Sequence, residues 1–236
     1  MPNSFFRFKQ FVVWQDRCAM KVGTDSVLLG AWAKGGSRIL DIGTGTGVIA
    51  IMMAQRCAHA RVIAVDIDPE ACAQAQDNVM ASPFVQQIDV RCLPVQQLAA
   101  DVDCHASFDA IVSNPPFFDN ALKAMGETRI IARHTDTLPF DQLFSAARKL
   151  LAPKGTFSTI IPFDYKTKFE AEAALAGFCV ARECAIRTTP RKPPRRYLLS
   201  FQVERPEEVT VEEHVLETQP GVRSQWYADI TQDFYL

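Results

Sequence analysis

The chain contains 236 residues, with 25 Lys and Arg against 27 Asp and Glu, and its formal net charge is −2. This balance excludes a global electrostatic attraction to nucleic acid, so any such binding has to come from local basic clusters. The N-terminus has no apolar run long enough for a signal peptide or a membrane span, and the seven cysteines include no Cys-x-x-Cys pair. We therefore expect a reduced, cytoplasmic protein without a metal site.

The length suits a single α/β domain covering residues 1–236. Apolar runs alternate with segments of helical length, at residues 38–42, 61–65, 108–112 and 156–161. This alternation predicts a doubly wound, mainly parallel sheet. A third strand that ends just before Leu93 and later strands at about 178–186 and 197–203 would bring the sheet to seven strands. Residues 205–236 would form a C-terminal extension packed on the body.

Two of the intervening segments carry clear helix signals. Asp68, Pro69 and Glu70 combine a capping carboxylate, a proline in the first turn and an acid near the positive end of the helix dipole. Residues 139–151 predict a second helix, because a proline and a glycine follow them closely.

The first apolar strand runs directly into a glycine-rich turn. Gly43, Gly45 and Gly47 allow the backbone to turn sharply and let a ligand approach closely. Asp66 follows the second strand at the distance expected of a ribose-binding carboxylate. Asp41 precedes the first glycine by two residues, where its charge would repel pyrophosphate and attract a cation. S-adenosylmethionine, which carries a sulfonium and an ammonium, fits this pattern better than a dinucleotide.

A second motif follows the strand predicted at 108–112. Asn114, Pro115, Pro116 and Phe117 place an amide, two prolines and an aromatic ring at its carboxyl end. Proline has no N–H to donate, so the neighbouring carbonyl groups can accept hydrogen bonds from a ligand. The motif is therefore suited to a planar group that bears an amine, such as a nucleobase. A proline-rich turn that merely ends the strand is the alternative.

Three segments are candidates for RNA binding. Residues 187–196 form a stiff, basic, proline-rich connection whose candidate contacts are Arg191, Lys192, Arg195 and Arg196. A solvated charged loop would explain the same composition. Phe8 and Lys9 belong to a stretch in which aromatic and basic residues alternate, as they do in single-strand binders, although an N-terminal strand covering the core would also explain them. Arg129 and Arg133 lie in the long polar stretch 121–138, whose length is typical of a lid or binding loop.

The glycine turn together with Asn114-Pro-Pro-Phe resembles the methyltransferases that act on amino groups of adenine, guanine or glutamine. The whole chain further resembles the bacterial enzymes that methylate adenosine 37 of a valine tRNA. The stretches that carry this narrower resemblance are Phe8-Lys-Gln-Phe, Asp16-Arg-Cys-Ala-Met-Lys-Val-Gly-Thr-Asp, Leu28-Leu-Gly-Ala-Trp, Ala132-Arg-His and Thr231-Gln-Asp-Phe-Tyr-Leu.

The resemblance implies a seven-stranded class I fold with an antiparallel final strand, S-adenosylmethionine as cofactor and the anticodon loop of a tRNA as partner. It implies that residues 1–35 cover the substrate and cofactor, with Lys21, Gly23 and Thr24 closing over the cofactor carboxylate. Ile67 would contact the cofactor, and Leu93 would contact the cofactor adenine through its backbone. Many relatives have an acidic residue near position 93, and this chain has Cys-Leu-Pro there.

Other members of the wider group provide alternative functions. Enzymes that methylate glutamine on release factors usually carry a helical domain before the glycine turn, and only residues 1–35 precede this unit. Methyltransferases acting on guanine N2 of rRNA share the motif but usually duplicate the domain. A cofactor-binding RNA chaperone without turnover is the non-catalytic alternative, and the intact Asn114-Pro-Pro-Phe motif argues against it.

Overall fold

The computed structural model describes residues 4–18, 20–117 and 138–236. Within them, the central sheet has eight strands in the order β10-β8-β9-β7-β6-β3-β4-β5, and β9 runs antiparallel to both of its neighbours. The strands are β3 (Arg38–Ile42), β4 (Arg61–Asp66), β5 (Ile88–Cys92), β6 (Phe108–Ser113), β7 (Leu151–Pro162), β8 (Cys179–Arg187), β9 (Arg196–Gln202) and β10 (Thr210–Val215). The predicted α/β class with a mainly parallel sheet is confirmed.

The strand count is corrected from seven to eight within the described residues. The additional strand is β10, which lies in the C-terminal extension and pairs in parallel with β8 at the sheet edge, where Glu212 faces Cys184. Its sequence, Thr-Val-Glu-Glu-His-Val, is mostly polar and leaves no residue fully buried. An edge strand of this kind gives little hydrophobic signal, so the apolar pattern did not indicate it.

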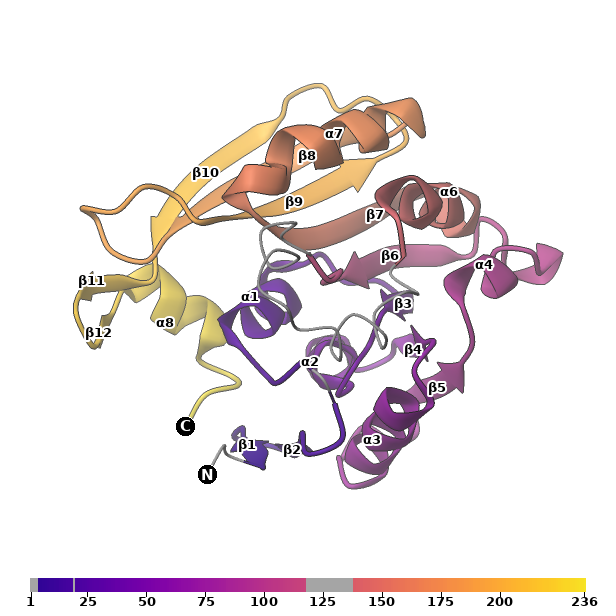
Figure 1. Ribbon diagram of the computed structural model, residues 1–236, viewed down its shortest axis with the longest axis horizontal. Coiled ribbons are helices and arrows are strands. Elements are labelled where there is room, and N and C mark those ends of the chain that lie inside the picture. Colours follow the sequence, from indigo (N-terminus) through magenta and orange to yellow (C-terminus); the bar gives the residue numbers. More distant parts are fainter. Residues whose placement is uncertain (1–3, 19, 118–137) are drawn as a thin grey trace, which may run out of the picture.

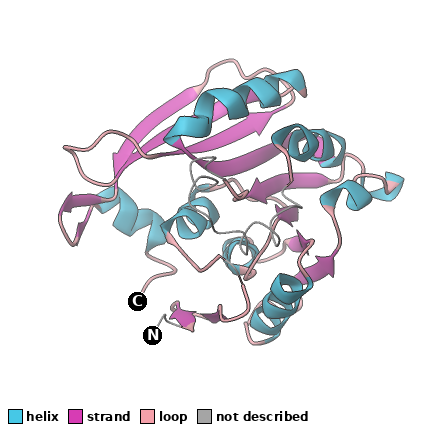
Figure 2. Cartoon of the chain, in the orientation of Figure 1, coloured by secondary structure: helices cyan, strands magenta, loops and turns pink. Residues whose placement is uncertain are grey.

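Helices cover both faces of the sheet (Figures 1 and 2). One face carries α1 (Thr24–Trp32), α2 (Val48–Arg56), α3 (Pro69–Met80) and α8 (Gln225–Thr231). The other face carries α4 (Val95–Leu98), α6 (Phe140–Leu150) and α7 (Lys166–Leu175). Successive strand residues alternate between the two cores, so that Ile39 packs into the first and Leu40 into the second.

The predicted helix signals have the expected local effects. The Asp68 side chain accepts a hydrogen bond from the Glu70 N–H at 2.9 Å, and Pro69 is the first residue of α3. The second predicted helix is α6, which ends at Leu150. Strand β7 begins at the next residue, five residues before the apolar run at 156–161, and an irregularity in its pairing with β6 accommodates the proline and glycine there.

The two chain ends lie close together (Figure 1). Near the N-terminus, β1 (Phe5–Arg7) pairs with β2 (Val12–Trp14), and near the C-terminus β11 (Glu217–Gln219) pairs with β12 (Val222–Arg223). The Lys9 N–H donates to the Phe234 carbonyl, with an N–O distance of 2.8 Å. None of the helices in the described residues combines the length and apolar character needed to cross a lipid bilayer.

Short 3₁₀ turns, η1 (Val102–Cys104) and η3 (Phe163–Tyr165), complete the connections. The second of these follows the carboxyl end of β7 directly. It therefore lies at the same edge of the sheet as the ends of the other parallel strands, where ligand sites of open α/β sheets are found.

Candidate functional site

Three strand ends meet at the carboxyl edge of the sheet and bring the two sequence motifs together. Ile42 at the end of β3 pairs with Val65 of β4 on one side and with Ser113 of β6 on the other. The Ser113 hydroxyl donates to the Ile42 carbonyl at 2.9 Å, which ties the two strand ends to each other. The glycine turn follows β3 and Asn114 follows β6, so the motifs leave neighbouring strands side by side.

The glycine turn is anchored to the end of β4. The backbone N–H groups of Gly43 and Thr44 donate to the Val65 carbonyl at 2.9 and 3.0 Å. Gly43 and Gly45 have φ values of +71° and +54°, which other residues rarely adopt, and a Cβ added at either position would meet no atom of the described residues within 4 Å. These two glycines therefore border open space that a ligand can enter.

The third glycine of the turn has a packing role. Gly47 has a φ of +80°, and a Cβ added there would lie 3.3 Å from the Cβ of Ala75 in α3. The glycine allows the start of α2 to approach α3 closely. Space for a ligand therefore depends on Gly43 and Gly45, whereas Gly47 sets the spacing of two helices.

Asp66 connects the glycine turn to the start of α3. Its Oδ2 accepts from the Gly45 N–H at 2.9 Å, and its Oδ1 accepts from the Asp68 N–H at 3.1 Å. The Asp66 carbonyl in turn accepts from the Leu93 N–H at 2.9 Å. Leu93, which is half-buried, is thus tied to the backbone of Asp66. Ile67 directly follows Asp66 in the chain, and its side chain is 46% exposed.

Asp41 lies fully buried beneath the turn. Its Oδ2 accepts from the Thr44 hydroxyl at 2.6 Å, whereas its Oδ1 has no hydrogen-bond partner among the described residues. Burial raises the pKa of the Asp41 carboxyl to about 7, against the lowering effects of the Thr44 hydroxyl and of the nearby Ala50 N–H in the first turn of α2. A buried carboxylate with an unpartnered oxygen, below an open glycine turn, fits a cofactor that carries positive charge.

The N-terminal segment is fastened to α3 by residues that the sequence analysis missed. The buried Asn78 side chain accepts from the Trp14 N–H at 2.8 Å and donates to the carbonyls of Trp14 and Thr46, at 2.8 and 2.9 Å. Gln74, also buried, accepts from the Arg17 N–H at 3.1 Å. One amide thus joins the N-terminal segment to the glycine turn, a link that follows from the fold and leaves no local sequence pattern.

The same segment leads into the residues predicted to close over the cofactor carboxylate. Gly23 has extended backbone geometry and precedes α1, of which Thr24 is the first residue. Lys21 is exposed two residues earlier, and the Val22 N–H donates to the Gln15 side chain at 2.8 Å. These residues lie at the start of α1 and just before it. They follow directly after the N-terminal segment that hydrogen bonds from Asn78 and Gln74 hold in place.

The Asn114 motif ends in a group of aromatic rings. Asn114 is half-buried and Pro115 is buried. The Phe117 ring lies 5.2 Å from the ring of Tyr165 and 6.0 Å from that of Phe140, measured between centroids. Tyr165 and Phe140 were not predicted to be neighbours of the motif, because they come from the turn after β7 and the first turn of α6.

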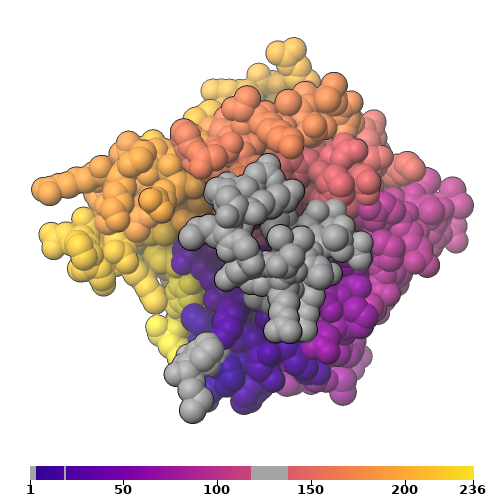
Figure 3. All heavy atoms as spheres, viewed as in Figure 1, coloured from indigo at the N-terminus to yellow at the C-terminus, as the bar shows by residue number. Residues whose placement is uncertain are grey.

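The basic loop leaves the same edge of the sheet. Pro162 at the carboxyl end of β7 pairs with Arg196 at the start of β9, so residues 188–195 lie at the carboxyl edge. Arg191, Lys192 and Arg195 are exposed. In Figures 1 and 3 this loop projects from the left of the molecule, beside the β11–β12 hairpin. Arg196 differs from the others because it is half-buried and forms an ion pair with Asp25 of α1.

The other candidate RNA contacts lie in different environments. Phe8 is only 2% exposed and stacks on Phe11 with a centroid distance of 4.5 Å, so it belongs to the core and is corrected from a stacking platform to a packing residue. An N-terminal strand that covers the core, the alternative explanation of this aromatic stretch, accounts for the burial of Phe8. The Lys9 ammonium donates to the Gln232 carbonyl, which joins the two chain ends. Arg129 and Arg133 lie outside the described residues.

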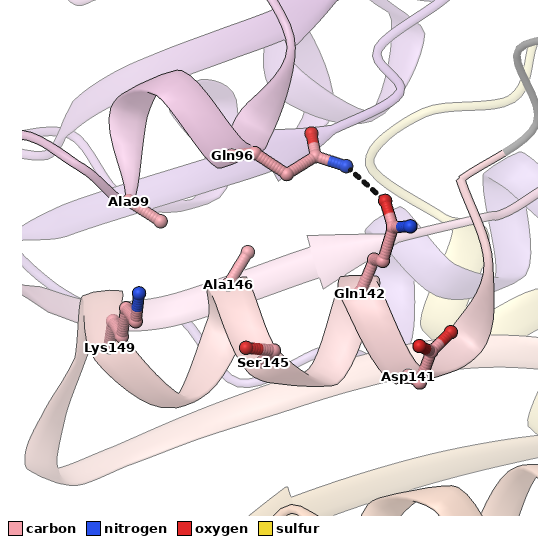
Figure 4. Close-up of a pocket in the computed structure, with 7 residues that line it drawn as sticks. All are labelled: Gln96, Ala99, Asp141, Gln142, Ser145, Ala146 and Lys149. Atoms are coloured by element: carbon pink, nitrogen blue, oxygen red, sulfur yellow. Dashed lines mark hydrogen bonds between the residues drawn. The ribbon is translucent and has the colours of Figure 1, made fainter.

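Two further features lie away from these motifs. A hollow of about 200 Å³ separates α4 from α6, where the Gln96 side chain donates to that of Gln142 at 2.7 Å (Figure 4). On β8 and β10, the side-chain atoms of Cys184, Glu212 and His214 that could ligate a metal ion lie within 4.8 Å of one another. Glu212 there is already paired with Arg182, a neighbour that disfavours a cation.

Known proteins are similar to this chain in sequence and in fold. The family model described as "Methyltransferase small domain" matches residues 20–178. A Phocaeicola vulgatus protein named tRNA1(Val) (adenine(37)-N6)-methyltransferase is 48% identical over 238 residues, covering 100% of this chain and 99% of its own. A Trichodesmium erythraeum protein of the same name is 39% identical, with the same coverage of each chain.

This chain belongs to the tRNA1(Val) (adenine(37)-N6)-methyltransferase family. Membership confirms the resemblance and the predicted class of S-adenosylmethionine-dependent methyltransferases. Solved structures agree at the level of the fold. A predicted O-methyltransferase from Agrobacterium tumefaciens has a TM-score of 0.65 at 18% identity, covering 89% of this chain and 96% of that one. P. horikoshii TYW2 in complex with MeSAdo has a TM-score of 0.58 at 12% identity, covering 84% and 69%.

Proposed function

We propose that this protein transfers a methyl group from S-adenosylmethionine to the exocyclic N6 amine of adenosine 37 in the anticodon loop of tRNA1(Val). The names of relatives up to 48% identical support the substrate. The observation that carries the proposal is the hydrogen bond between Ser113 and Ile42, because it holds the amine-binding motif beside the glycine turn. We place this enzyme in the cytoplasm, where such a substrate is found, and its sequence implies no obligate protein partner.

The cofactor would be held mainly by charge and by backbone. Asp66 accepts hydrogen bonds from the ribose hydroxyls, while Gly43 and Gly45 leave room for the methionyl part beside the turn. The unpartnered Oδ1 of Asp41 favours the positive charge of the cofactor. When bound, S-adenosylmethionine supplies an activated methyl group on its sulfonium.

The remaining cofactor contacts come from the flanking segments. Ile67 directly follows Asp66, and the Leu93 N–H donates to the Asp66 carbonyl, so both residues are close enough in the fold to contact the adenine, with the backbone at Leu93 making the polar contact. Lys21 would pair with the methionyl carboxylate, next to Gly23 and Thr24. The segment that carries these three residues is held in place through Asn78 and Gln74.

The target adenine would be held by Asn114 and its neighbours. The N6 amine donates to the Asn114 side-chain oxygen and to the Pro115 carbonyl, which orient the nitrogen and stabilise the positive charge that develops on it. Phe117 stacks on the base, with Tyr165 packed behind it to fix the ring. A conjugated amine is a poor nucleophile, so positioning is the main catalytic contribution, and the surplus proton leaves to water.

The RNA backbone would be held by exposed cations at the same edge. Arg191, Lys192 and Arg195 contact phosphates, and Arg129 and Arg133 are proposed to add contacts from outside the described residues. An anticodon loop suits this arrangement because its bases are unpaired, so turning one into the site costs less than it would in a duplex.

A labelling experiment tests the proposal. The purified protein is incubated with methyl-labelled S-adenosylmethionine and total tRNA from a strain lacking the enzyme, and the tRNA is digested to nucleosides. We expect label in N6-methyladenosine. Label in N2-methylguanosine would replace the substrate, label on protein glutamine would replace the substrate class, and cofactor binding without transfer would favour a chaperone.

A further inference from the structure

A cavity of about 500 Å³ opens at the carboxyl edge of the sheet, between the end of β7 and the basic loop. Pro162 and Phe163 line it from the β7 side, Arg195 and Arg196 from the loop, and Asp25 from α1. The described residues that line it include none of Asn114 to Phe117. The cavity is therefore separate from the proposed site of the target base.

An exposed aromatic ring forms part of the wall. Phe163 is 49% exposed, and its ring stacks on that of Tyr197, with a centroid distance of 5.9 Å and an interplanar angle of 29°. The Phe163 N–H donates to the Arg195 carbonyl at 2.9 Å, which fixes this turn to the basic loop. The ring is thus supported by Tyr197 and held in place, and much of its surface stays open to the cavity.

The charged groups that line the cavity are Arg195 and Arg196 of the loop and the carboxylates of Asp25 and Asp164. Arg196 is paired with Asp25, and both side chains are about one-third exposed, so this arginine is held in a fixed position. Arg195 is exposed beside it. A flat apolar ring next to guanidinium groups is the combination with which proteins hold unpaired bases and their phosphates.

The cavity lies over the strands next to the one that carries Asn114. Strand β7 is the direct neighbour of β6, with Ser113 beside Thr159, and β9 is the next strand along. Neighbouring strands are about 4.8 Å apart and a strand rises about 3.3 Å per residue, so the cavity, which begins three residues beyond Thr159, lies on the order of 10 Å from Asn114. A nucleotide adjacent to the target in the RNA chain spans that separation.

We propose that this cavity binds the nucleotide next to the target adenosine, with its base stacked on Phe163 and its phosphate on Arg195. The inference rests on the proposed function, since it assumes an RNA substrate. It assigns to Phe163 a role in choosing RNA by its flanking nucleotide. Phe163 is then a binding residue that holds the RNA chain and leaves the chemistry at N6 to Asn114.

The test compares Phe163→Ala and Phe163→Tyr with Leu175→Ala. Leu175 is 84% exposed at the far end of α7, so its truncation removes a similar exposed apolar group away from the site. The RNA is an anticodon stem-loop of tRNA1(Val), used intact or with an abasic nucleotide on one side of the target or the other. Dissociation constants for RNA, kcat and KM are measured for each pair.

We expect Phe163→Ala to weaken binding of the intact stem-loop roughly 5- to 150-fold, as the loss of one base stack does, and to raise KM more than it lowers kcat. Phe163→Tyr should restore binding, and Leu175→Ala should leave it unchanged. On the stem-loop that is abasic at the neighbour held in the cavity, wild type and Phe163→Ala should bind equally.

Unchanged binding by Phe163→Ala would overturn the assignment, as would a loss that persists in full on both abasic stem-loops. Failure of the cavity assignment is distinguishable from failure of the proposed function. If only the cavity assignment is wrong, wild type still methylates the adenosine of the intact stem-loop. If the proposed function is wrong, wild type transfers no methyl group to adenosine, and the inference falls with the function on which it rests.

Discussion

The Oδ2 atom of Asp66 accepts a hydrogen bond from the backbone N–H of Gly45, with an N–O distance of 2.9 Å. The carboxylate at the end of β4 and the glycine turn after β3 therefore form one unit. In the proposed function this unit binds the cofactor ribose. The same contact makes the shape of the turn depend on Asp66.

Replacing Asp66 should weaken cofactor binding. Asp66→Asn removes the negative charge and replaces one carboxylate oxygen by an NH2 group. Both oxygens of Asp66 accept backbone hydrogen bonds, from the Gly45 and Asp68 N–H groups, so the amide cannot make both. We expect the dissociation constant for S-adenosylmethionine to rise roughly 10- to 150-fold, the effect of losing hydrogen bonds to a charged group. Calorimetric titration measures it, with Asp103→Asn on the exposed η1 turn as the matched control. Equal affinity in wild type and Asp66→Asn would remove Asp66 from the cofactor site.

Removing the amide of Asn114 should reduce turnover. Asn114→Ala deletes one of the two acceptors proposed for the target amine, and the loss of an oriented dipole of this kind typically costs about 10² or more in kcat. The affinity for S-adenosylmethionine should change much less, because the cofactor depends on the glycine turn. Single-turnover rates and calorimetry separate the two effects. Near-full activity of Asn114→Ala would make the proposed mechanism wrong.

Reversing charge on the basic loop should weaken RNA binding and flatten its salt dependence. The change is Arg191, Lys192 and Arg195 to Glu, and Arg196 is kept because it pairs with the half-buried Asp25. Each lost phosphate contact should reduce the slope of log K against log salt by about 0.7 for a single strand. Binding titrations of tRNA at several salt concentrations measure this slope.

A matched reversal at the opposite edge of the sheet serves as control. Arg148, Lys149 and Lys154 are exposed near the end of α6 and the start of β7. Changing all three to Glu alters net charge by the same amount, and the salt slope should stay as in wild type. If both triple variants lowered the slope equally, RNA recognition would lie elsewhere on the surface.

Cofactor affinity should depend on pH through Asp41. Burial raises the pKa of this carboxyl to about 7 in the free protein, so it is ionised above that pH and protonated below it. A cationic cofactor binds the ionised form better, and affinity should therefore fall as pH drops below about 7. Asp41→Asn should bind more weakly and lose this dependence. A steep pH dependence retained by Asp41→Asn would assign it to another group.

The same carboxyl should affect stability with the opposite sign. Its pKa in the unfolded chain is about 4, so the folded state holds the proton more tightly. The resulting stabilisation is present below pH 4 and is lost as pH rises toward about 7. The free energy of unfolding of cofactor-free protein, measured by denaturant titration across this window, should show that decline in wild type and less of it in Asp41→Asn.

Asn78→Ala should destabilise the protein. The buried amide makes three hydrogen bonds, to Trp14 and Thr46, and its removal leaves their backbone groups unpaired. We expect a loss of about 2–4 kcal/mol in the free energy of unfolding. Gln96→Ala, which removes an exposed amide, should cost little. Equal stability of Asn78→Ala and wild type would show that other contacts hold the N-terminal segment.

Local patterns predicted the parts of the molecule that depend on local geometry. The turn at Gly43 and Gly45 was predictable because its conformation requires glycine, and the start of α3 because Asp68 caps it. The link through Asn78 was not predictable, since it joins residues 64 and 32 positions apart that only the fold brings together. The environment of Phe117 was missed for the same reason, because Tyr165 comes from another strand end.

Amphipathic patterns were the less reliable guide. Phe8 was assigned to RNA because aromatic and basic residues alternate around it, yet the same alternation arises when a strand covers a core. Strand β10 was missed because its exposed edge carries mostly polar residues. The treatment of residues 1–236 as one domain stays a prediction, as do the individual roles assigned to the site residues.

In the proposed function, the edge of the sheet that carries Asp66 and Asn114 methylates one adenine amine of one tRNA. This function is tested most directly by incubating unmodified tRNA1(Val) transcript with S-adenosylmethionine and wild type or Asn114→Ala, then locating the methyl group by mass spectrometry of nuclease fragments. The account predicts one added methyl group on N6 of adenosine 37 with wild type and almost none with Asn114→Ala. A methyl group on a guanosine or on another adenosine, or equal modification by both proteins, would contradict it.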